Sequence, residues 1–168
     1  MNSGSMDQQA IAAELAATGA QELLETTSAH LAYSAGDGSP RVVPVGVFWT
    51  GTEFVVSTAV TAPKVAALQA RPEVALSIEG GSTPEQARAL SVRGRASIKI
   101  VDGLVPEYVA AARRSMGAEA AAGFEKSCRE RYDQMARIAV GPSWVRFYDF
   151  GAGRMPTFLK ELAERNRS

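Results

Sequence analysis

A lysine at the start of a predicted helix is the strongest candidate for chemistry in this sequence. Lys64 follows Thr61-Ala62-Pro63, where a hydroxyl residue and a proline mark a helix start. A helix N-terminus offers free N–H groups and a positive dipole end, and a lysine there adds a full charge, so this pattern favours a phosphate. The alternative is an ordinary solvated lysine, although its charge opposes the helix dipole.

A predicted β-hairpin precedes this helix. Residues 41–49 are rich in β-branched and aromatic side chains, and the pattern resumes at residues 53–58 after Thr50-Gly51. Pro44 cannot donate to a strand ladder, which places it at a sheet edge, at a bulge, or where another molecule approaches the backbone.

The aromatic run from Trp144 to Pro156 is a second candidate site. Within it, Tyr148 and Arg154 could border a small-molecule pocket, or the aromatic residues could fill the core and Arg154 could be a loop charge. The GAG at residues 151–153 is too short for a dinucleotide fingerprint, which needs a strand, GxGxxG and a helix in that order.

The chain contains one histidine, His30, and one cysteine, Cys128. A single histidine without a cluster of other ligands does not make a metal site, so we expect no metal. Without a second histidine, a Ser-His-Asp or Cys-His mechanism is also disfavoured. We expect Cys128 to be buried and inert, and its isolation excludes an internal disulfide, which fits a reducing cytoplasm.

The order of the predicted elements indicates the fold class. We expect a helix within residues 7–24 broken near Gly19, strands at 26–34, 73–79, 89–101, 138–140 and 143–150, and helices at 63–71, 106–116, 118–136 and 158–165. Gly94 in the long strand suggests a bulge. Strands and helices do not alternate, so a doubly wound sheet is disfavoured. The expectation is a mainly β fold with peripheral helices (α+β), a split β-barrel of six to seven mostly antiparallel strands.

Length and charge place limits on the organisation and partners of the chain. The 168 residues suit a single domain, with residues 1–6 resembling an expression-vector remnant and residues 7–168 forming the domain. The 18 Lys+Arg balance the 18 Asp+Glu, so charge gives no argument for a nucleic-acid or membrane partner. No apolar run approaches the roughly 20 residues that span a bilayer, and no signal peptide is evident. A cytoplasmic location is expected.

The segment after the hairpin resembles the pyridoxamine 5'-phosphate oxidase-like superfamily of flavin-binding split barrels. The similarity lies in PRVVPV, in the strand ending VST, and in the run Lys64, Val65, Leu68, Arg71-Pro72 and Val74-Ala75-Leu76. It extends over roughly residues 30–156 and is greatest to the small actinobacterial-type branch, whose members use FMN or 8-hydroxy-5-deazaflavin.

The resemblance implies a role for each of several residues. It implies that Arg41 and Lys64 bind the flavin phosphate, that Val42, Val43 and Pro44 run along the ring, and that Ser57 or Thr58 contacts it. Tyr148 would pack near the flavin, and Arg154 would reach the substrate. Three positions depart from the namesake oxidase: Gly46 replaces a substrate-binding lysine, Ala62-Pro63 replace Ser-Arg, and a flavin-contacting glutamine is replaced near Ala89. Thr61 could restore a hydroxyl contact to the phosphate.

The resemblance implies an FMN-binding oxidoreductase that transfers hydride to or from an unknown small molecule, with the flavin between the subunits of a homodimer. Pyridoxamine phosphate is a doubtful substrate because of the departures above. A deazaflavin-dependent reductase is one alternative, for which Arg71, Arg88, Arg93 and Arg95 could supply extra cations. A non-catalytic flavin or haem carrier or sensor is another, with His30 as the candidate haem ligand.

Overall fold

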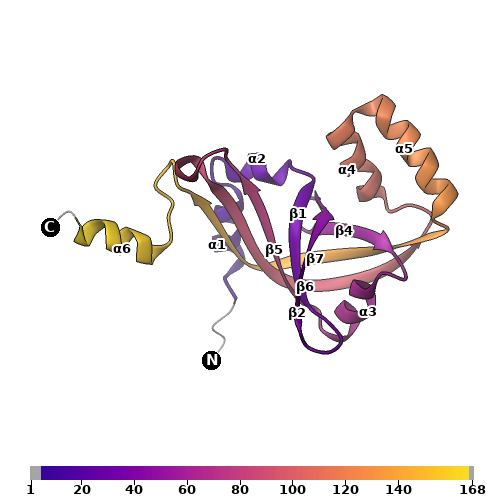
Figure 1. Cartoon of the computed structure of the whole chain (residues 1–168), viewed down its shortest axis with the longest axis horizontal. Coiled ribbons are helices and arrows are strands. Elements are labelled where there is room, and N and C mark those ends of the chain that lie inside the picture. The colour runs from indigo at the N-terminus through magenta and orange to yellow at the C-terminus, as the bar shows by residue number, and fades with distance from the viewer. Residues whose placement is uncertain (1–4, 167–168) are drawn as a thin grey trace.

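One antiparallel sheet dominates the computed structural model, which describes residues 5–166 (Figure 1). Within those residues seven strands lie in the order β2-β1-β5-β6-β7-β4-β3, and six α-helices surround them. The sheet is not closed, so the expected mainly β split barrel with peripheral helices is confirmed. The strands are β1 (Ser28–Ser34), β2 (Pro40–Gly46), β3 (Phe48–Trp49), β4 (Phe54–Ala59), β5 (Glu73–Gly80), β6 (Arg88–Asp102) and β7 (Gln134–Asp149). The helices are α1 (Gln8–Leu15), α2 (Ala20–Leu24), α3 (Pro63–Ala70), α4 (Pro106–Met116), α5 (Ala118–Arg131) and α6 (Thr157–Arg165).

The long β6–β7 hairpin connects the two halves of the sheet. The first half of β6 pairs with β5, which extends to β1 and β2, whereas the first half of β7 pairs with β4, which in turn pairs with β3. The two halves therefore attach at opposite ends of one hairpin, which leaves the barrel split. Pro44 lies on the edge strand β2, as its missing N–H requires.

A bulge bends the hairpin at Gly94, as the sequence predicts. The register shifts between Arg93 and Gly94, so that Gly94 faces Pro142 and Arg95 faces Gly141. A Cβ atom on Gly94 would lie 2.4 Å from the carbonyl oxygen of Gly141. Only glycine allows the two strands to approach this closely.

We expect Gly94→Ala to lower the free energy of unfolding by about 1–3 kcal/mol, because the clashing neighbour is backbone that cannot rotate away. Gly123→Ala is the matched control: no atom lies within 4 Å of its added Cβ, on an exposed face of α5. The control should gain about 0.5–1 kcal/mol from helix propensity. Urea denaturation of both variants measures the difference, and equal stability would contradict the close approach.

Two predicted elements differ from the structure in the second half of the chain. The helix expected to reach Ala136 ends at Arg131, and β7 begins at Gln134. Met135 and Ala136 are buried between β4 and β6, so packing in the sheet overrides the helix propensity of alanine. The strands expected on either side of Gly141-Pro142 form one continuous strand, because Pro142 lies opposite the bulge, where proline is tolerated.

The N-terminal region breaks at Gly19 as expected, with φ of +89°. Residues 1–4 of the proposed vector remnant lie outside the described residues. Met6 lies within them: its N–H donates to the carbonyl of Ser143 at 2.8 Å, and its side chain packs against the core. In the described part of the chain, no helix is long and apolar enough to cross a membrane.

The core has two parts that position different surfaces. The larger part lies between the sheet and the helices α1 and α2, and includes Ile11, Leu31, Phe54 and Phe147. The smaller part lies under the α4–α5 hairpin, where Val105, Cys128 and Met135 are buried. In Figure 1 the α4–α5 hairpin and helix α6 lie at opposite ends of the molecule.

Candidate functional site

Lys64 lies in the first turn of α3, directly after the loop that follows β4. Ala62, not Thr61, is the N-cap residue, and no side chain caps the helix, so Thr61 as a cap is wrong by one residue. Lys64 is half-buried, and among the described residues it forms no ion pair and no side-chain hydrogen bond. Pro63 has no N–H, and the Val65 N–H already donates to the Ala62 carbonyl at 2.9 Å. The first turn of α3 therefore offers an anion chiefly the unpaired ammonium group of Lys64 at the positive end of the helix dipole.

Arg41 is held by the turn between β1 and β2. Its Nη1 donates to Ser39 Oγ at 2.6 Å, and its Nη2 lies 3.9 Å from Asp37. The Ser39 hydroxyl and N–H hold the pKa of Asp37 below its usual value, and Arg41 contributes less. Arg71, which follows the C-terminus of α3, donates to the Ala35 carbonyl of the same turn at 2.7 Å. The structure thus links Arg41 to the Arg71 end of α3, about 10 Å along the helix axis from Lys64.

The other predicted contacts alternate between the two faces of their strands. On β2 the side chain of Val43 packs against the core, whereas Val42 is 65% exposed and Pro44 is also exposed. On β4, Ser57 and Thr58 are consecutive and therefore point to opposite faces. A flavin ring that lies on one face of β4 can therefore contact the side chain of Ser57 or that of Thr58, but not both.

Tyr148 and Arg154 share a second cavity, of about 430 Å³, with Glu14 of α1. Glu14 accepts hydrogen bonds from Arg146 at 3.1 Å, from Arg154 at 2.9 Å and from the N–H of Phe147 at 2.8 Å. These contacts attach α1 to the second half of β7, beyond the residues that pair with β4. Arg154 is therefore anchored, with its guanidinium 5.4 Å from the Phe147 ring.

The two predicted ends of the flavin site are far apart in one chain. Thr58 pairs with Ala136 near the start of β7, and Tyr148 lies twelve residues further along that strand. At about 3.3 Å per residue, roughly 40 Å of strand separates them. One protomer thus groups Lys64, Thr61 and Thr58 at one end, and Tyr148 with Arg154 at the other.

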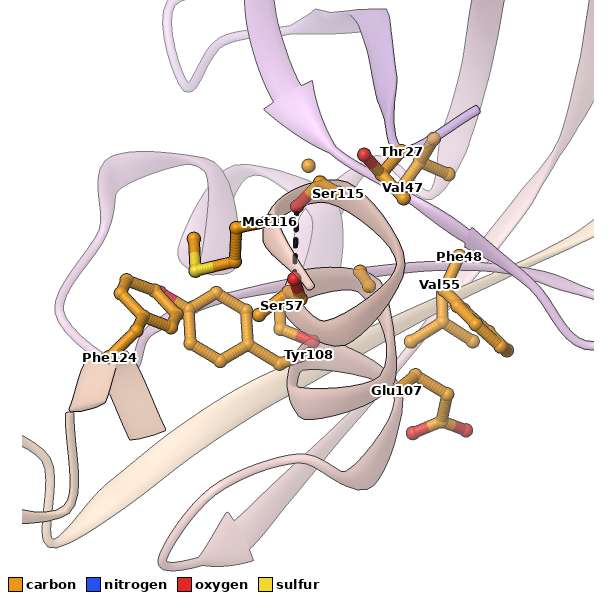
Figure 2. Close-up of a pocket in the computed structure, with 13 residues that line it drawn as sticks. Thr27, Val47, Phe48, Val55, Ser57, Glu107, Tyr108, Ser115, Met116 and Phe124 are labelled. Atoms are coloured by element: carbon orange, nitrogen blue, oxygen red, sulfur yellow. Dashed lines mark hydrogen bonds between the residues drawn. The ribbon is translucent and has the colours of Figure 1, made fainter. Parts of the chain in front are cut away.

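A smaller cavity, of about 150 Å³, lies beneath α4 next to Ser57 (Figure 2). Its lining is mostly apolar, with Phe48, Tyr108 and Phe124 among the residues that form it. Gly46, which occupies the position of the namesake oxidase's substrate lysine, also lines it. The structure therefore brings one predicted flavin contact, Ser57, and one of the departures from the namesake oxidase, Gly46, to the same cavity.

An ion pair at the edge of this cavity could not be predicted from the sequence. Glu107 Oε1 accepts from Arg137 Nη2 at 2.6 Å and from Nε at 3.0 Å, and the carboxylate of Glu53 lies 3.5 Å from Nη2. The Arg137 hydrogen bond lowers the pKa of Glu107, and Glu107 raises the pKa of Arg137. Glu107 Oε2 is buried without a hydrogen-bond partner among the described residues. The only sequence signal was an acidic residue in a helix first turn, which does not identify a partner thirty residues away.

Tyr108, on the same helix, is held as a neutral phenol. Burial and then the neighbouring Cys128 thiol raise the pKa of Tyr108 to about 12. Its hydroxyl lies 3.9 Å from Cys128 Sγ, and its ring packs against Phe124 with centroids 5.6 Å apart. Cys128 is buried, as expected.

His30 lies on the outward face of β1, opposite Pro44 on β2 and Ser77 on β5, and is exposed. In residues 5–166, no three side chains of His, Cys, Asp or Glu lie close enough together to hold a metal ion. Any haem bound through His30 would therefore lie on an open sheet face.

The open antiparallel sheet, with α3 following β4 and a helical hairpin between β6 and β7, defines a split-barrel protein. The chain belongs to the pyridoxamine 5'-phosphate oxidase family, whose model matches residues 17–147. No curated protein sequence matches the chain.

Several solved structures share this fold. They include the conserved hypothetical protein Rv2991 from Mycobacterium tuberculosis, with 19% identity over 90% of this chain and 89% of that chain and a TM-score of 0.61. A protein named F420 reductase is 25% identical over 74% of this chain and 94% of that chain, with a TM-score of 0.50. HutZ, a heme storage protein from Vibrio cholerae, is 16% identical over 74% and 89%, with a TM-score of 0.55. The resemblance recognised in the sequence is thus confirmed at the level of the family.

Proposed function

We propose that this protein is a flavin-dependent oxidoreductase that binds FMN between two copies of the chain. The observation that carries the proposal is the N-terminus of α3, where Lys64 has no acidic partner in the described part of the chain and no side chain caps the helix. A phosphate would pair with the ammonium group of Lys64 at the positive end of the helix dipole. The residues at this end of the site therefore fit the phosphate of a flavin.

The distance between the two groups of predicted contacts supports a shared site. Tyr148 and Arg154 cannot reach the flavin of their own chain if its phosphate lies at Lys64, because about 40 Å of β7 intervenes. A second copy, related by a two-fold axis, could bring its Tyr148 and Arg154 to the Lys64 end of the first. The exposed Val42 and Pro44 on the edge strand β2 offer an apolar surface for the ring or for the partner.

In this proposal the chain binds and orients, and needs no side-chain acid or base. Lys64 and the first turn of α3 hold the phosphate, Thr61 lies directly before that turn, and β2 aligns the ring. Tyr148 and Arg154 border the substrate space, with Arg154 held in place by Glu14. When bound, the flavin supplies hydride transfer at its N5.

A deazaflavin is the second candidate cofactor, because a protein named F420 reductase is 25% identical to the chain over most of its own length. The four arginines suggested for a longer acidic tail are, however, already engaged. Arg71 donates to two carbonyls, Arg88 pairs with Glu22 at 2.6 Å, Arg93 stacks 4.2 Å over Trp144, and Arg95 pairs with Glu73. This arrangement favours FMN.

An absorbance spectrum of the purified protein, followed by titration with FMN and with the deazaflavin, tests the proposal. We expect uptake of FMN, and light scattering should report a dimer. Selective uptake of the deazaflavin would keep the site but change the cofactor. A haem band would direct attention to His30, and a flavin-binding monomer would contradict the shared site.

A further inference from the structure

The small cavity beneath α4 has the size of a single ring. Its volume of about 150 Å³ equals that of an engineered apolar cavity that binds benzene in another protein. Figure 2 shows the rings of Tyr108 and Phe124 side by side on one side of Ser57, with Phe48 and Val55 on the other. Ordered aromatic walls of this kind suit a planar apolar molecule.

The cavity offers no surplus charge to a ligand. Among the described residues that line it, none is lysine or arginine, and Glu107 is the one charged residue. The charge of Glu107 is balanced by Arg137 at 2.6 Å. The nearby Arg114 lies 4.6 Å over the Phe48 ring and pairs with Glu25 at 3.4 Å. An anion buried here would lose its hydration without gaining a counter-charge from the described lining residues.

The polar groups of the cavity are the hydroxyls of Thr27, Ser57, Tyr108 and Ser115 and the carboxylate of Glu107, whose Oε2 has no hydrogen-bond partner among the described residues. Ser115 Oγ already donates to the carbonyl of Ala112 at 3.2 Å, and Tyr108 is occupied by Cys128. Ser57 has no side-chain hydrogen bond among the described residues, so its hydroxyl is free to bond a ligand. One polar group on an otherwise apolar molecule would be enough to satisfy it.

We propose that this cavity binds an uncharged, single-ring molecule that carries one hydroxyl or carbonyl group, which is hydrogen-bonded by Ser57. This cavity is distinct from the substrate space proposed above, because neither Tyr148 nor Arg154 lines it. The class excludes phosphate esters and carboxylates, for which the described lining residues supply no cation.

Titration of the full chain with phenol, toluene and benzoate, followed by ligand-observed NMR, tests this class of ligand. We expect phenol to bind at least tenfold more tightly than benzoate. Ala111→Leu should weaken phenol binding at least tenfold, because Ala111 lines the cavity. Ala110→Leu, one position away on the same helix and outside the lining, is the matched control and should bind phenol as the wild type does.

Ser57→Ala gives a second measurement that does not depend on filling the cavity. It should weaken phenol binding and leave toluene binding unchanged. The proposal is overturned if benzoate binds as tightly as phenol, or if Ala111→Leu binds phenol as the wild type does. Phenol binding is measured without FMN, so a protein that binds phenol as described but takes up no flavin would retain the ligand class and lose the proposed function. FMN uptake without phenol binding would retain the proposed function and overturn the ligand class.

Discussion

Lys64→Ala is expected to weaken FMN binding by about 10- to 100-fold, because a hydrogen bond to a charged group contributes about 1.5–3 kcal/mol. The effect should be large here since Lys64 has no acidic partner among the described residues, so its charge is available to the ligand. The fold should be intact, because the side chain is half-buried at a helix start and not in the core. Fluorescence titration with FMN measures the affinity, and thermal unfolding checks the fold.

Two further titrations make the expected effect specific to the phosphate. Lys99→Ala removes an exposed lysine on β6 and should bind FMN as the wild type does. Riboflavin, which lacks the phosphate, should bind the wild type and Lys64→Ala with similar affinity. An unchanged FMN affinity in Lys64→Ala would place the phosphate elsewhere, with Arg41 as the next candidate.

The single strand expected at residues 41–49 is wrong: β2 pairs with β1 and β3 pairs with β4, at opposite edges of the sheet, so only the β3–β4 part of the predicted hairpin forms. The sequence predicted other local features of the candidate site because they depend on neighbouring residues. The order of β4, loop and α3 around Lys64, the edge position of Pro44 and the bulge at Gly94 all follow from residue types within a short window. The end of α5 could not be predicted in this way, because burial of Ala136 between distant strands determines it.

Contacts between distant parts of the chain explain what the sequence did not reveal. Arg137 meets Glu107 and Glu53 only because β7 passes beneath α4 and beside β4. In the same way, Glu14 accepts a hydrogen bond from Arg154, although the two residues are 140 positions apart in the sequence. No pattern in either segment identifies the partner, so the ion pair beside the cavity and the anchoring of Arg154 emerged only from the fold.

Arg137→Gln is expected to lower the free energy of unfolding at pH 7 by about 1–3 kcal/mol, because it leaves Glu107 partly buried without its counter-charge. In the wild type the pKa of Glu107 is lowered from 4.5, so this stabilisation is present above about pH 4.5 and is lost as the pH falls through the lowered pKa. In the variant, burial raises the pKa of Glu107, so the variant loses stability as the pH rises above about 4.5.

The difference in stability between wild type and Arg137→Gln should therefore be largest near pH 7 and should shrink towards pH 4, which urea denaturation at both values measures. Arg129→Gln is the control, because the Arg129 side chain is exposed and Glu125 keeps its second ion pair with Arg113 at 3.3 Å, so its carboxylate is not left without a counter-charge. A difference that is the same at both pH values would show that Arg137 stabilises the fold through packing alone. A large effect of Arg129→Gln would show that the contribution is not specific to the pair beside the cavity. A pH-dependent loss confined to Arg137→Gln would establish that Glu107 is ionised beneath α4, which is the condition for a cavity without surplus charge.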